Sequence, residues 1–205
     1  KSMQAGHNQY APMPGVPVLR KVIAEVAHRT YQRPTDAETE VTITAGGTEA
    51  IFSAVAALVN AGDEVILFDP SYDSYDPAIR LNGGIPIQIN LKPPHFSIDW
   101  QEVKDKITSR TRMIMINTPH NPTGAVLREE DLKTLEELAL KHGLIVLSDE
   151  VYERLIFDNL THQSVLRFPA LASQSIAVFS FGKTFSRHRM EGGLHGGRGL
   201  PHQRN

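Results

Sequence analysis

The sequence predicts an α/β protein, a three-layer sandwich in which helices cover both faces of a mainly parallel sheet. Two observations predict this fold class. Helix-like and strand-like segments alternate along the chain, and most strand-like segments are continuously apolar, as strands buried on both faces are. In such sheets the crossovers are right-handed, and ligands bind beyond the carboxyl ends of the strands. The residues that follow each strand are therefore the candidates for function.

The first two helices are expected where apolar residues recur three and four positions apart. The apolar face of the first helix, within residues 14–33, comprises Val16, Leu19, Val22, Ile23 and Val26. The apolar face of the second helix, within residues 48–62, comprises Ile51, Ala54, Val55, Leu58 and Val59. Gly62 provides the stop signal of the second helix.

Two further helices and the strands complete the expected layout. Residues 99–107 predict a short helix, and residues 128–143 predict a longer one with an acidic first turn and a basic end, which suits the helix dipole. The expected strands are residues 41–47, 64–70, 85–91, 112–119, 144–150 and 175–181. The first strand is a short β-branched run that ends in two glycines, and most of the others are apolar runs of the buried type.

Composition narrows the class of protein. The 205 residues are enough for one sizeable domain, and 40% hydrophobic with 21% charged residues is typical of a soluble globular protein. A net charge of −2 gives no basic field for nucleic acid, and no apolar run in the sequence is long enough to cross a membrane. The absence of cysteine excludes disulfides and thiolate metal sites. We expect a cytoplasmic protein without a metal site.

Polar or glycine-containing stretches follow five of the predicted strands. They are Gly46–Glu49, Asp69–Tyr72, Asn117–Pro122, Ser148–Tyr152 and Ser180–Lys183. Gly-Gly-Thr at the start of a helix is typical of a phosphate cradle, because exposed N–H groups and the helix dipole favour an anion. The sequence has no Walker motif and no Gly-x-Gly-x-x-Gly motif, so a nucleotide is not the expected ligand.

Each of these groups also has an ordinary structural explanation. The glycine pair is compatible with a plain turn, Asp149 with a helix N-cap, and Lys183 with a solvated surface lysine. Tyr72 and Tyr152 are compatible with packed tyrosines whose hydroxyls reach water. Together, however, these groups converge on one sheet edge. They are the parts needed to hold a flat, phosphorylated, pyridine-type cofactor and to bond it to an amine.

Six motifs carry a resemblance to a known family. They are YAPMPGVPVLR, TAGGTEA, DPSYDSY, NTPHNPTG, SDEVYERL and SFGKTF. In this order and spacing they resemble the class I and II aminotransferases of pyridoxal 5'-phosphate (PLP) fold type I. The branch that contains kynurenine and methionine aminotransferases looks most similar. The resemblance covers residues 6–185.

The resemblance implies roles for the residues that would face the cofactor ring. Lys183 matches the catalytic lysine that bonds covalently to the cofactor and shuttles a proton. Asp149 matches the acid that pairs with the pyridine nitrogen, and an ionised carboxylate there keeps the ring protonated. Asn121 and Tyr152 match donors to the ring's phenolic oxygen. Tyr72 matches the aromatic ring that stacks on the cofactor.

The resemblance also implies contacts to the cofactor phosphate. These come from the backbone of Gly47, Thr48 and Glu49 and from Ser180 in the same chain, and from Tyr10 across a homodimer interface. Asn121–Pro122 falls where the family has a cis proline bond. His120 lies beside these groups in the sequence, but neither its position nor the resemblance gives it a role.

The implied function is a two-stage amino transfer between an L-amino acid and a 2-oxo acid. Three other functions use the same constellation or fold. They are a PLP-dependent carbon–sulfur lyase, an aminocyclopropane-carboxylate synthase, and the aminotransferase-like sensing domain of a GntR-type transcription regulator. Product analysis distinguishes the enzymes, and an upstream winged helix identifies the regulator. A chain with the fold but without activity is a further alternative.

Residues 186–205 break the pattern and are predicted to be an aberrant, frameshifted tail. The resemblance implies a continuation similar to TFHATGWK-GY, but this chain continues as TFSRHRMEGGLHGG. In the frame displaced by one base, the codons of Met190 and Glu191 must encode tryptophan, and their neighbours permit the rest of that motif. A native Gly/His/Arg tail is the alternative. Residues 1–185 are expected to form part of the cofactor-binding large domain, with the small domain missing.

Overall fold

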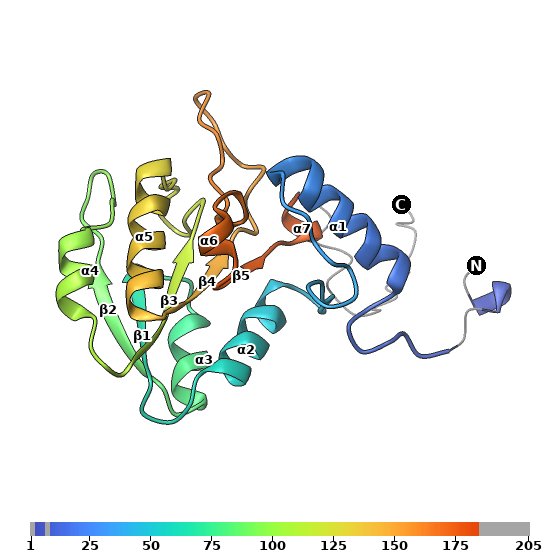
Figure 1. Ribbon diagram of the computed structural model, residues 1–205, viewed down its shortest axis with the longest axis horizontal. Helices are drawn as coiled ribbons and strands as arrows, with labels where there is room; N and C mark the ends of the chain where they lie inside the picture. Colours follow the sequence, from blue (N-terminus) through green and yellow to red (C-terminus); the bar gives the residue numbers. More distant parts are fainter. Residues whose placement is uncertain (1–2, 7–8, 185–205) are drawn as a thin grey trace, which may run out of the picture.

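The core of the fold is a parallel five-stranded sheet in the computed structural model, which describes residues 3–6 and 9–184 (Figure 1). The strands are β1 (Glu64–Asp69), β2 (Ile85–Asn90), β3 (Thr111–Asn117), β4 (Ile145–Asp149) and β5 (Ser175–Val178). Their order across the sheet is β2-β1-β3-β4-β5, and every neighbouring pair is parallel. The predicted α/β class with a mainly parallel sheet is therefore confirmed.

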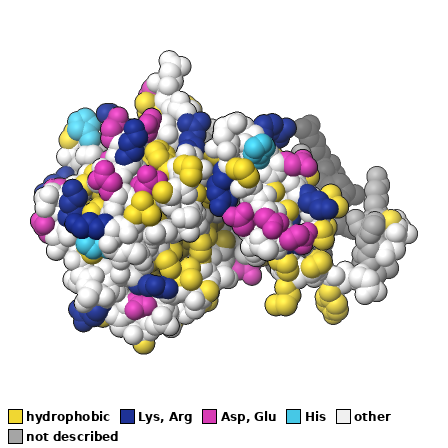
Figure 2. All heavy atoms as spheres, viewed as in Figure 1, with side chains coloured by type: hydrophobic (Ala, Val, Ile, Leu, Met, Phe, Trp, Pro, Cys, Tyr) yellow, Lys and Arg dark blue, Asp and Glu magenta, His cyan; other side chains and the backbone are white. Residues whose placement is uncertain are grey.

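Helices connect the strands and cover both faces of the sheet (Figure 1). The longer ones are α1 (Pro17–Tyr31), α2 (Gly47–Leu58), α3 (Tyr75–Leu81), α4 (Trp100–Lys106) and α5 (Glu129–His142). The short ones are η1 (Met3–Ala5), η2 (Val165–Arg167), α6 (Pro169–Ala172) and α7 (Phe181–Thr184). Figure 2 shows acidic and basic side chains interspersed over the visible face, in keeping with the net charge of −2.

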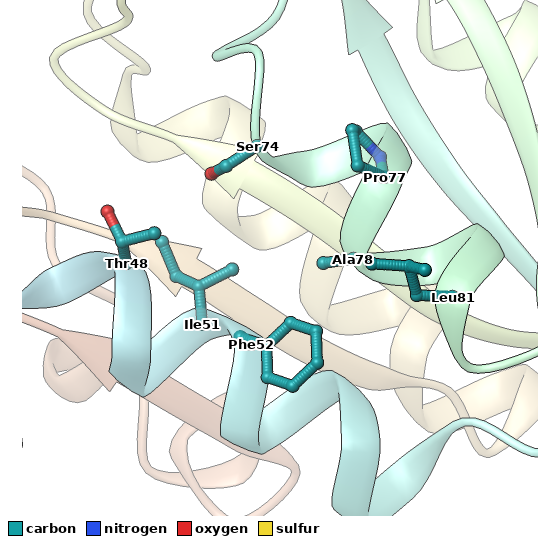
Figure 3. A pocket seen from close by; sticks show the side chains of 7 residues that line it. All are labelled: Thr48, Ile51, Phe52, Ser74, Pro77, Ala78 and Leu81. Atoms are coloured by element: carbon teal, nitrogen blue, oxygen red, sulfur yellow. The ribbon is translucent and has the colours of Figure 1, made fainter.

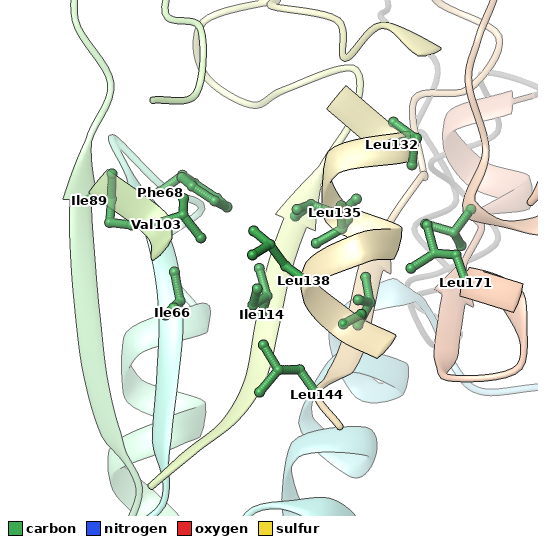
Figure 4. Close-up of a cluster of buried hydrophobic side chains, with 14 of the residues drawn as sticks. Ile66, Phe68, Ile89, Val103, Ile114, Leu132, Leu135, Leu138, Leu144 and Leu171 are labelled. Carbon is green, nitrogen blue, oxygen red and sulfur yellow. The ribbon is translucent and has the colours of Figure 1, made fainter. Parts of the chain in front are cut away.

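Two apolar cores lie on opposite faces of the sheet, because side chains alternate along each strand. Ile114 and Ile116 of β3 pack with α4 and α5, where Leu132, Leu135 and Leu138 are buried (Figure 4). Met113 and Met115 of the same strand pack on the other side with α2 and α3. The three layers of the predicted sandwich follow from this alternation.

The predicted strand at residues 41–47 is not a strand in the structure. Val41 is buried, but the segment up to Thr44 pairs with no strand among the described residues. Instead, the Ile43 N–H donates to the Pro14 carbonyl oxygen over 3.0 Å. A strand requires a hydrogen-bonded neighbour, which β-branched composition alone does not supply. The other predicted strands are confirmed.

Two further features differ from expectation. Helix α3 was not predicted, and it contains Pro77 in its first turn, where proline is tolerated because the first N–H groups of a helix have no intrahelical acceptor. Helix α1 forms as predicted, but Val16, Leu19 and Val22 of its apolar face are exposed. Its buried side chains are instead Arg20, Ala24 and Tyr31. The predicted frameshifted tail, residues 186–205, lies outside the described residues and stays a prediction.

Membrane-spanning helices and metal-binding clusters are both absent from the described residues. None of the described helices is long and apolar enough to cross a membrane. The same residues contain no cluster of His, Cys, Asp and Glu side chains that could hold a metal ion.

The core makes a direct prediction about stability. We expect Leu135→Ala to lower the free energy of unfolding by about 2–5 kcal/mol, because the fully buried side chain leaves a cavity. Leu140→Ala on the same helix is the matched control, since its side chain is 46% exposed, and should cost about 0.5 kcal/mol or less. Urea unfolding of both variants measures the difference. Equal losses of unfolding free energy in the two variants would contradict the orientation of α5, which buries Leu135 and exposes Leu140.

Candidate active site

The ends of β3 and β4 are joined by one buried amide. Register pairs Asn117 with Asp149, and both residues are buried. The Asn117 side chain donates from Nδ2 to the Asp149 carbonyl oxygen over 2.8 Å and accepts from the Asn121 N–H over 2.6 Å. The Thr118 N–H also donates to the Asp149 carbonyl oxygen. The sequence-predicted Asp149 and Asn121 are thus fixed on adjacent strand ends.

Both oxygens of the Asp149 carboxylate accept hydrogen bonds. The Tyr75 hydroxyl donates to Oδ2 over 2.5 Å, and the Val151 N–H donates to Oδ1 over 3.2 Å. Asp149 does not cap a helix, because a turn follows it. Burial raises the pKa of Asp149 above its ordinary value, while the Tyr75 hydrogen bond and the charge of Lys183 oppose this rise.

Lys183 lies in α7, directly after β5, and is partly buried. Its Nζ lies 5.6 Å from the centroid of the Tyr152 ring, over the ring face. Its backbone N–H lies 3.5 Å from Oγ of Ser180, which is buried. The structure therefore brings Lys183, Tyr152 and Ser180 together at the same edge as Asp149. Burial raises the pKa of Asp149, and the positive charge of Lys183 offsets part of that rise.

A tyrosine pair links α3 to the start of α2. The Tyr72 and Tyr75 rings meet edge to face with centroids 5.6 Å apart. The Tyr72 hydroxyl lies 3.4 Å from Oγ1 of Thr48. Tyr72 is partly buried and Thr48 is exposed. The contacts from Tyr75 through Tyr72 to Thr48 therefore connect the buried carboxylate of Asp149 with the surface.

The glycine turn before α2 has the features of an anion cradle. Gly46 has φ +130°, where a side chain is strained, and a Cβ there would have open space around it. A Cβ on Gly47 would lie only 3.1 Å from Val151, so α2 begins close against the end of β4. The first N–H groups of α2 have no carbonyl one turn earlier in the helix and are available to an anion. The Glu49 carboxylate accepts the Ala45 N–H across this turn.

The predicted residue Tyr10 and His120, to which no role was assigned, lie apart from the central cluster. His120 is buried, and its Nδ1 lies 2.8 Å from Oγ1 of Thr123, so its ring serves the local turn. Burial lowers the pKa of His120, which favours the neutral ring. Tyr10 is fully exposed on the segment before α1, which extends away from the sheet (Figure 1). The Asn121–Pro122 bond is cis, as the resemblance implied.

Sequence reasoning missed three positions around the site. Asn117 and Tyr75 hold Asp149, as described above. Glu150 is fully buried, accepts from the Ser148 hydroxyl and the Val165 N–H, and lies 2.7 Å from Nε2 of His162. The second tyrosine of DPSYDSY was the available signal for Tyr75. Nothing in the sequence pairs Glu150 with a histidine twelve residues away.

A separate apolar pocket lies between α2 and α3 (Figure 3). It is lined by Thr48, Ile51, Phe52, Ser74, Pro77, Ala78 and Leu81. None of these side chains is charged, so the pocket lacks the groups that the strand ends provide. The candidate site is therefore the strand-end cluster rather than this pocket.

The parallel sheet, whose strand ends gather an aspartate, a lysine, an asparagine and a glycine turn, has the fold of PLP fold type I aminotransferases. The chain belongs to the aminotransferase class I and II family, whose sequence profile matches residues 1–192. Enzymes of this family depend on PLP.

Individual relatives support the branch suggested by the motifs. The chain is 51% identical to methionine aminotransferase of Escherichia coli over 180 residues, 88% of this chain and 47% of that protein. It is 38% identical to human kynurenine–oxoglutarate transaminase 3, over 87% of this chain and 42% of that protein. The crystal structure of YbdL from Escherichia coli, for which a methionine aminotransferase function was identified, matches with a TM-score of 0.88 at 49% identity. That match covers 90% of this chain and 49% of YbdL. The chain thus spans about half the length of the relatives it matches.

The raised pKa of Asp149 predicts a specific pH dependence of stability in the cofactor-free protein. Above the ordinary aspartate pKa of 3.8, the unfolded chain loses this proton more readily than the folded one, so the contribution of Asp149 falls as pH rises. Asp149→Asn has no carboxyl group to ionise, so its stability does not fall with pH for this reason, and its side-chain oxygen can still accept from Tyr75. We expect the variant to gain stability relative to wild type as pH rises from about 4 to about 7.

Urea unfolding across that pH range measures the difference between the two proteins, in which all other carboxyl groups are shared. Asp73→Asn in an exposed loop is the control and should show no such trend. If the free energy of unfolding of Asp149→Asn relative to wild type stays constant or falls as pH rises, ionised Asp149 does not destabilise the folded protein, and the prediction is wrong.

Proposed function

We propose that this chain is part of a PLP-dependent aminotransferase, which moves an amino group between an L-amino acid and a 2-oxo acid. The observation that carries the proposal is the gathering of Asp149, Lys183 and Asn121 at one sheet edge, beside the glycine turn of α2. Membership of the aminotransferase class I and II family supports it. The named relatives use different amino acids, so the proposal specifies the class of substrate.

The residues present fit the cofactor in charge and in shape. Asp149 is a buried carboxylate, and no positive side chain among residues 3–6 and 9–184 forms an ion pair with it, which suits a site for a cationic ring nitrogen. The open space at Gly46 and the free N–H groups at the start of α2 suit a phosphate. Lys183 provides a primary amine within the electrostatic reach of Asp149.

We assign the binding contacts accordingly. The backbone of Gly47, Thr48 and Glu49 and the hydroxyl of Ser180 would hold the phosphate. Asp149 would pair with the ring nitrogen, because two donors already fix its plane.

The remaining contacts involve the ring itself. Asn121 and Tyr152 would donate to the phenolic oxygen of the ring. Tyr72 would cover one ring face, since its own ring is partly buried and held edge-on by Tyr75.

The chemistry divides between cofactor and protein. When bound, PLP supplies an aldehyde that bonds to amines and a ring that withdraws electrons. Lys183 Nζ is the group that would bond to that aldehyde and, once displaced by a substrate amine, would take a proton from the substrate Cα and return it. Asp149 would hold the ring nitrogen proton in place through its charge. Asn117 keeps Asp149 and the Asn121 backbone aligned during this exchange.

The first test concerns Lys183 in the full-length protein. We expect wild type with PLP to show a visible absorbance band that borohydride bleaches. After the reduction, the cofactor should remain covalently attached to the peptide that contains Lys183. Lys183→Ala should lose the band and reduce transamination by at least about 100-fold, because the nucleophile and proton carrier is gone. Lys141→Ala, on the exposed side of α5, is the matched control. Unchanged turnover in Lys183→Ala would refute the assignment.

The second test concerns Tyr10 and the oligomer. We propose a two-fold homodimer in which Tyr10 of one protomer completes the partner's site, because Tyr10 is fully exposed here and remote from its own strand ends. Tyr10→Ala and Lys183→Ala should each be impaired alone. After subunit exchange in an equimolar mixture, about half of the dimers should be mixed and each of these should contain one wild-type site. The mixture should therefore recover about a quarter of wild-type activity.

The recovery of activity distinguishes a Tyr10 that serves the partner's site from a Tyr10 that serves its own protomer. If Tyr10 served its own protomer, no mixed dimer would contain an intact site, and activity would not rise. A full-length protein that is active as a monomer would also contradict the proposal.

A further inference from the structure

We propose that Tyr75 is a positioning residue that holds one oxygen of Asp149 and thereby sets how this carboxylate meets the cofactor ring nitrogen. The inference rests on the proposed PLP-dependent function. It gives a role to a buried hydroxyl on α3, 74 residues before its partner in the sequence.

The geometry around Asp149 carries the inference. The Tyr75 side chain is 4% exposed, and its hydroxyl donates to Oδ2 over 2.5 Å. The Val151 N–H holds the other oxygen, Oδ1, over 3.2 Å. The two donors come from α3 and from the turn after β4, on either side of the carboxylate. A carboxylate held at both oxygens keeps a defined plane, which a charge-assisted contact to a flat ring requires.

Tyr75 also contacts the aromatic ring proposed to stack on the cofactor. Its ring meets Tyr72 edge to face at 5.6 Å, and the Tyr72 hydroxyl lies near Thr48 at the start of α2. One side chain therefore contacts both the carboxylate and the stacking ring. A shift of Tyr75 would displace both groups together.

The charges around Asp149 define what this hydrogen bond does. Burial raises the pKa of Asp149, and the nearby charge of Glu150 raises it further. The Tyr75 hydrogen bond and the positive charge of Lys183 lower the pKa of Asp149. Burial raises the pKa of Tyr75 itself, so its hydroxyl remains protonated and acts as a donor. Removing the hydroxyl therefore favours a neutral Asp149, which cannot pair with a cationic ring nitrogen.

Tyr31 provides a matched control within the same chain. It is also a buried tyrosine, and its hydroxyl donates to a carboxylate, that of Glu153. Its ring stacks on Phe179 rather than on a ring assigned to the cofactor. Tyr31→Phe and Tyr75→Phe therefore remove the same atom from comparable surroundings, and only Tyr75→Phe acts on Asp149.

The first measurement uses the cofactor-free chain. Protein labelled with 13C at aspartate carboxyls is titrated by NMR, and Asp149→Asn identifies the Asp149 signal. We expect the Asp149 signal to titrate at higher pH in Tyr75→Phe than in wild type, and at the wild-type pH in Tyr31→Phe. An unchanged Asp149 titration in folded Tyr75→Phe would overturn the inference, whether or not the chain binds PLP.

The second measurement uses PLP as the probe with the full-length protein. We expect Tyr75→Phe to weaken PLP binding by about tenfold at pH about 6, with the deficit shrinking towards higher pH as Asp149 ionises. Adding Tyr75→Phe to Asp149→Asn should cause little further loss, since the hydroxyl acts through the carboxylate. Equal PLP affinities of Tyr75→Phe and wild type at every pH would overturn the positioning role. Failure of wild type to bind PLP would instead refute the proposed function. In that case the NMR titration of Asp149 would still test the hydrogen bond between Tyr75 and Asp149.

Discussion

The pairing of Asn117 with Asp149 at the end of the β3–β4 ladder is the constraint on which the site depends. A strand that slips by one residue turns every side chain to the opposite face. Such a slip would move the Asp149 carboxylate away from Tyr75 and the Asn117 amide away from the Asn121 backbone. The buried amide of Asn117 spans both strand ends, so it can satisfy its partners only in the observed register. The β3–β4 register therefore positions the Asn117 amide and the Asp149 carboxylate, and the hydrogen bonds of these two groups in turn favour that register.

The site also carries a cost that the surrounding fold must offset. Asp149 and Glu150 are consecutive buried carboxyl groups, and each is satisfied by different means. Asp149 relies on Tyr75 and on a backbone N–H, whereas Glu150 has a hydroxyl, a backbone N–H and His162. Two adjacent acidic groups inside a protein are tolerated only when hydrogen bonds or opposite charges surround them. The apolar cores on both faces of the sheet supply the stability that makes this arrangement possible.

Most of the sheet could be predicted from the sequence, because nearly all residues of β1, β3 and β4 are buried and these strands have a strongly apolar pattern. The prediction failed at residues 41–47, where the pattern is strand-like but pairing depends on a neighbour that local sequence does not specify. The rule that ligands bind at strand ends drew attention to Asp149, the last residue of β4, and to Lys183 in the short helix that follows β5. It could not find Tyr75, because the hydrogen bond of this residue to Asp149 joins positions that only the fold brings together. The exposed apolar face of α1 was missed for the same reason, because periodicity reveals a face but not what covers it.

The strand order has a consequence for how the protein is made. From β1 and β2 onwards, each new strand joins the same growing side of the sheet, so the order β1, β3, β4, β5 in space follows the order of synthesis. On the ribosome, α3 can pack against β1 and β3 before β4 has emerged, and the hydroxyl of Tyr75 must then wait for its acceptor. Before β4 is present, the β3 edge has no partner strand, and the Tyr75 hydroxyl can bond to water in place of Asp149. Residues 145–149 supply both the missing strand and the acceptor, so one segment completes the sheet edge and the carboxylate contact together.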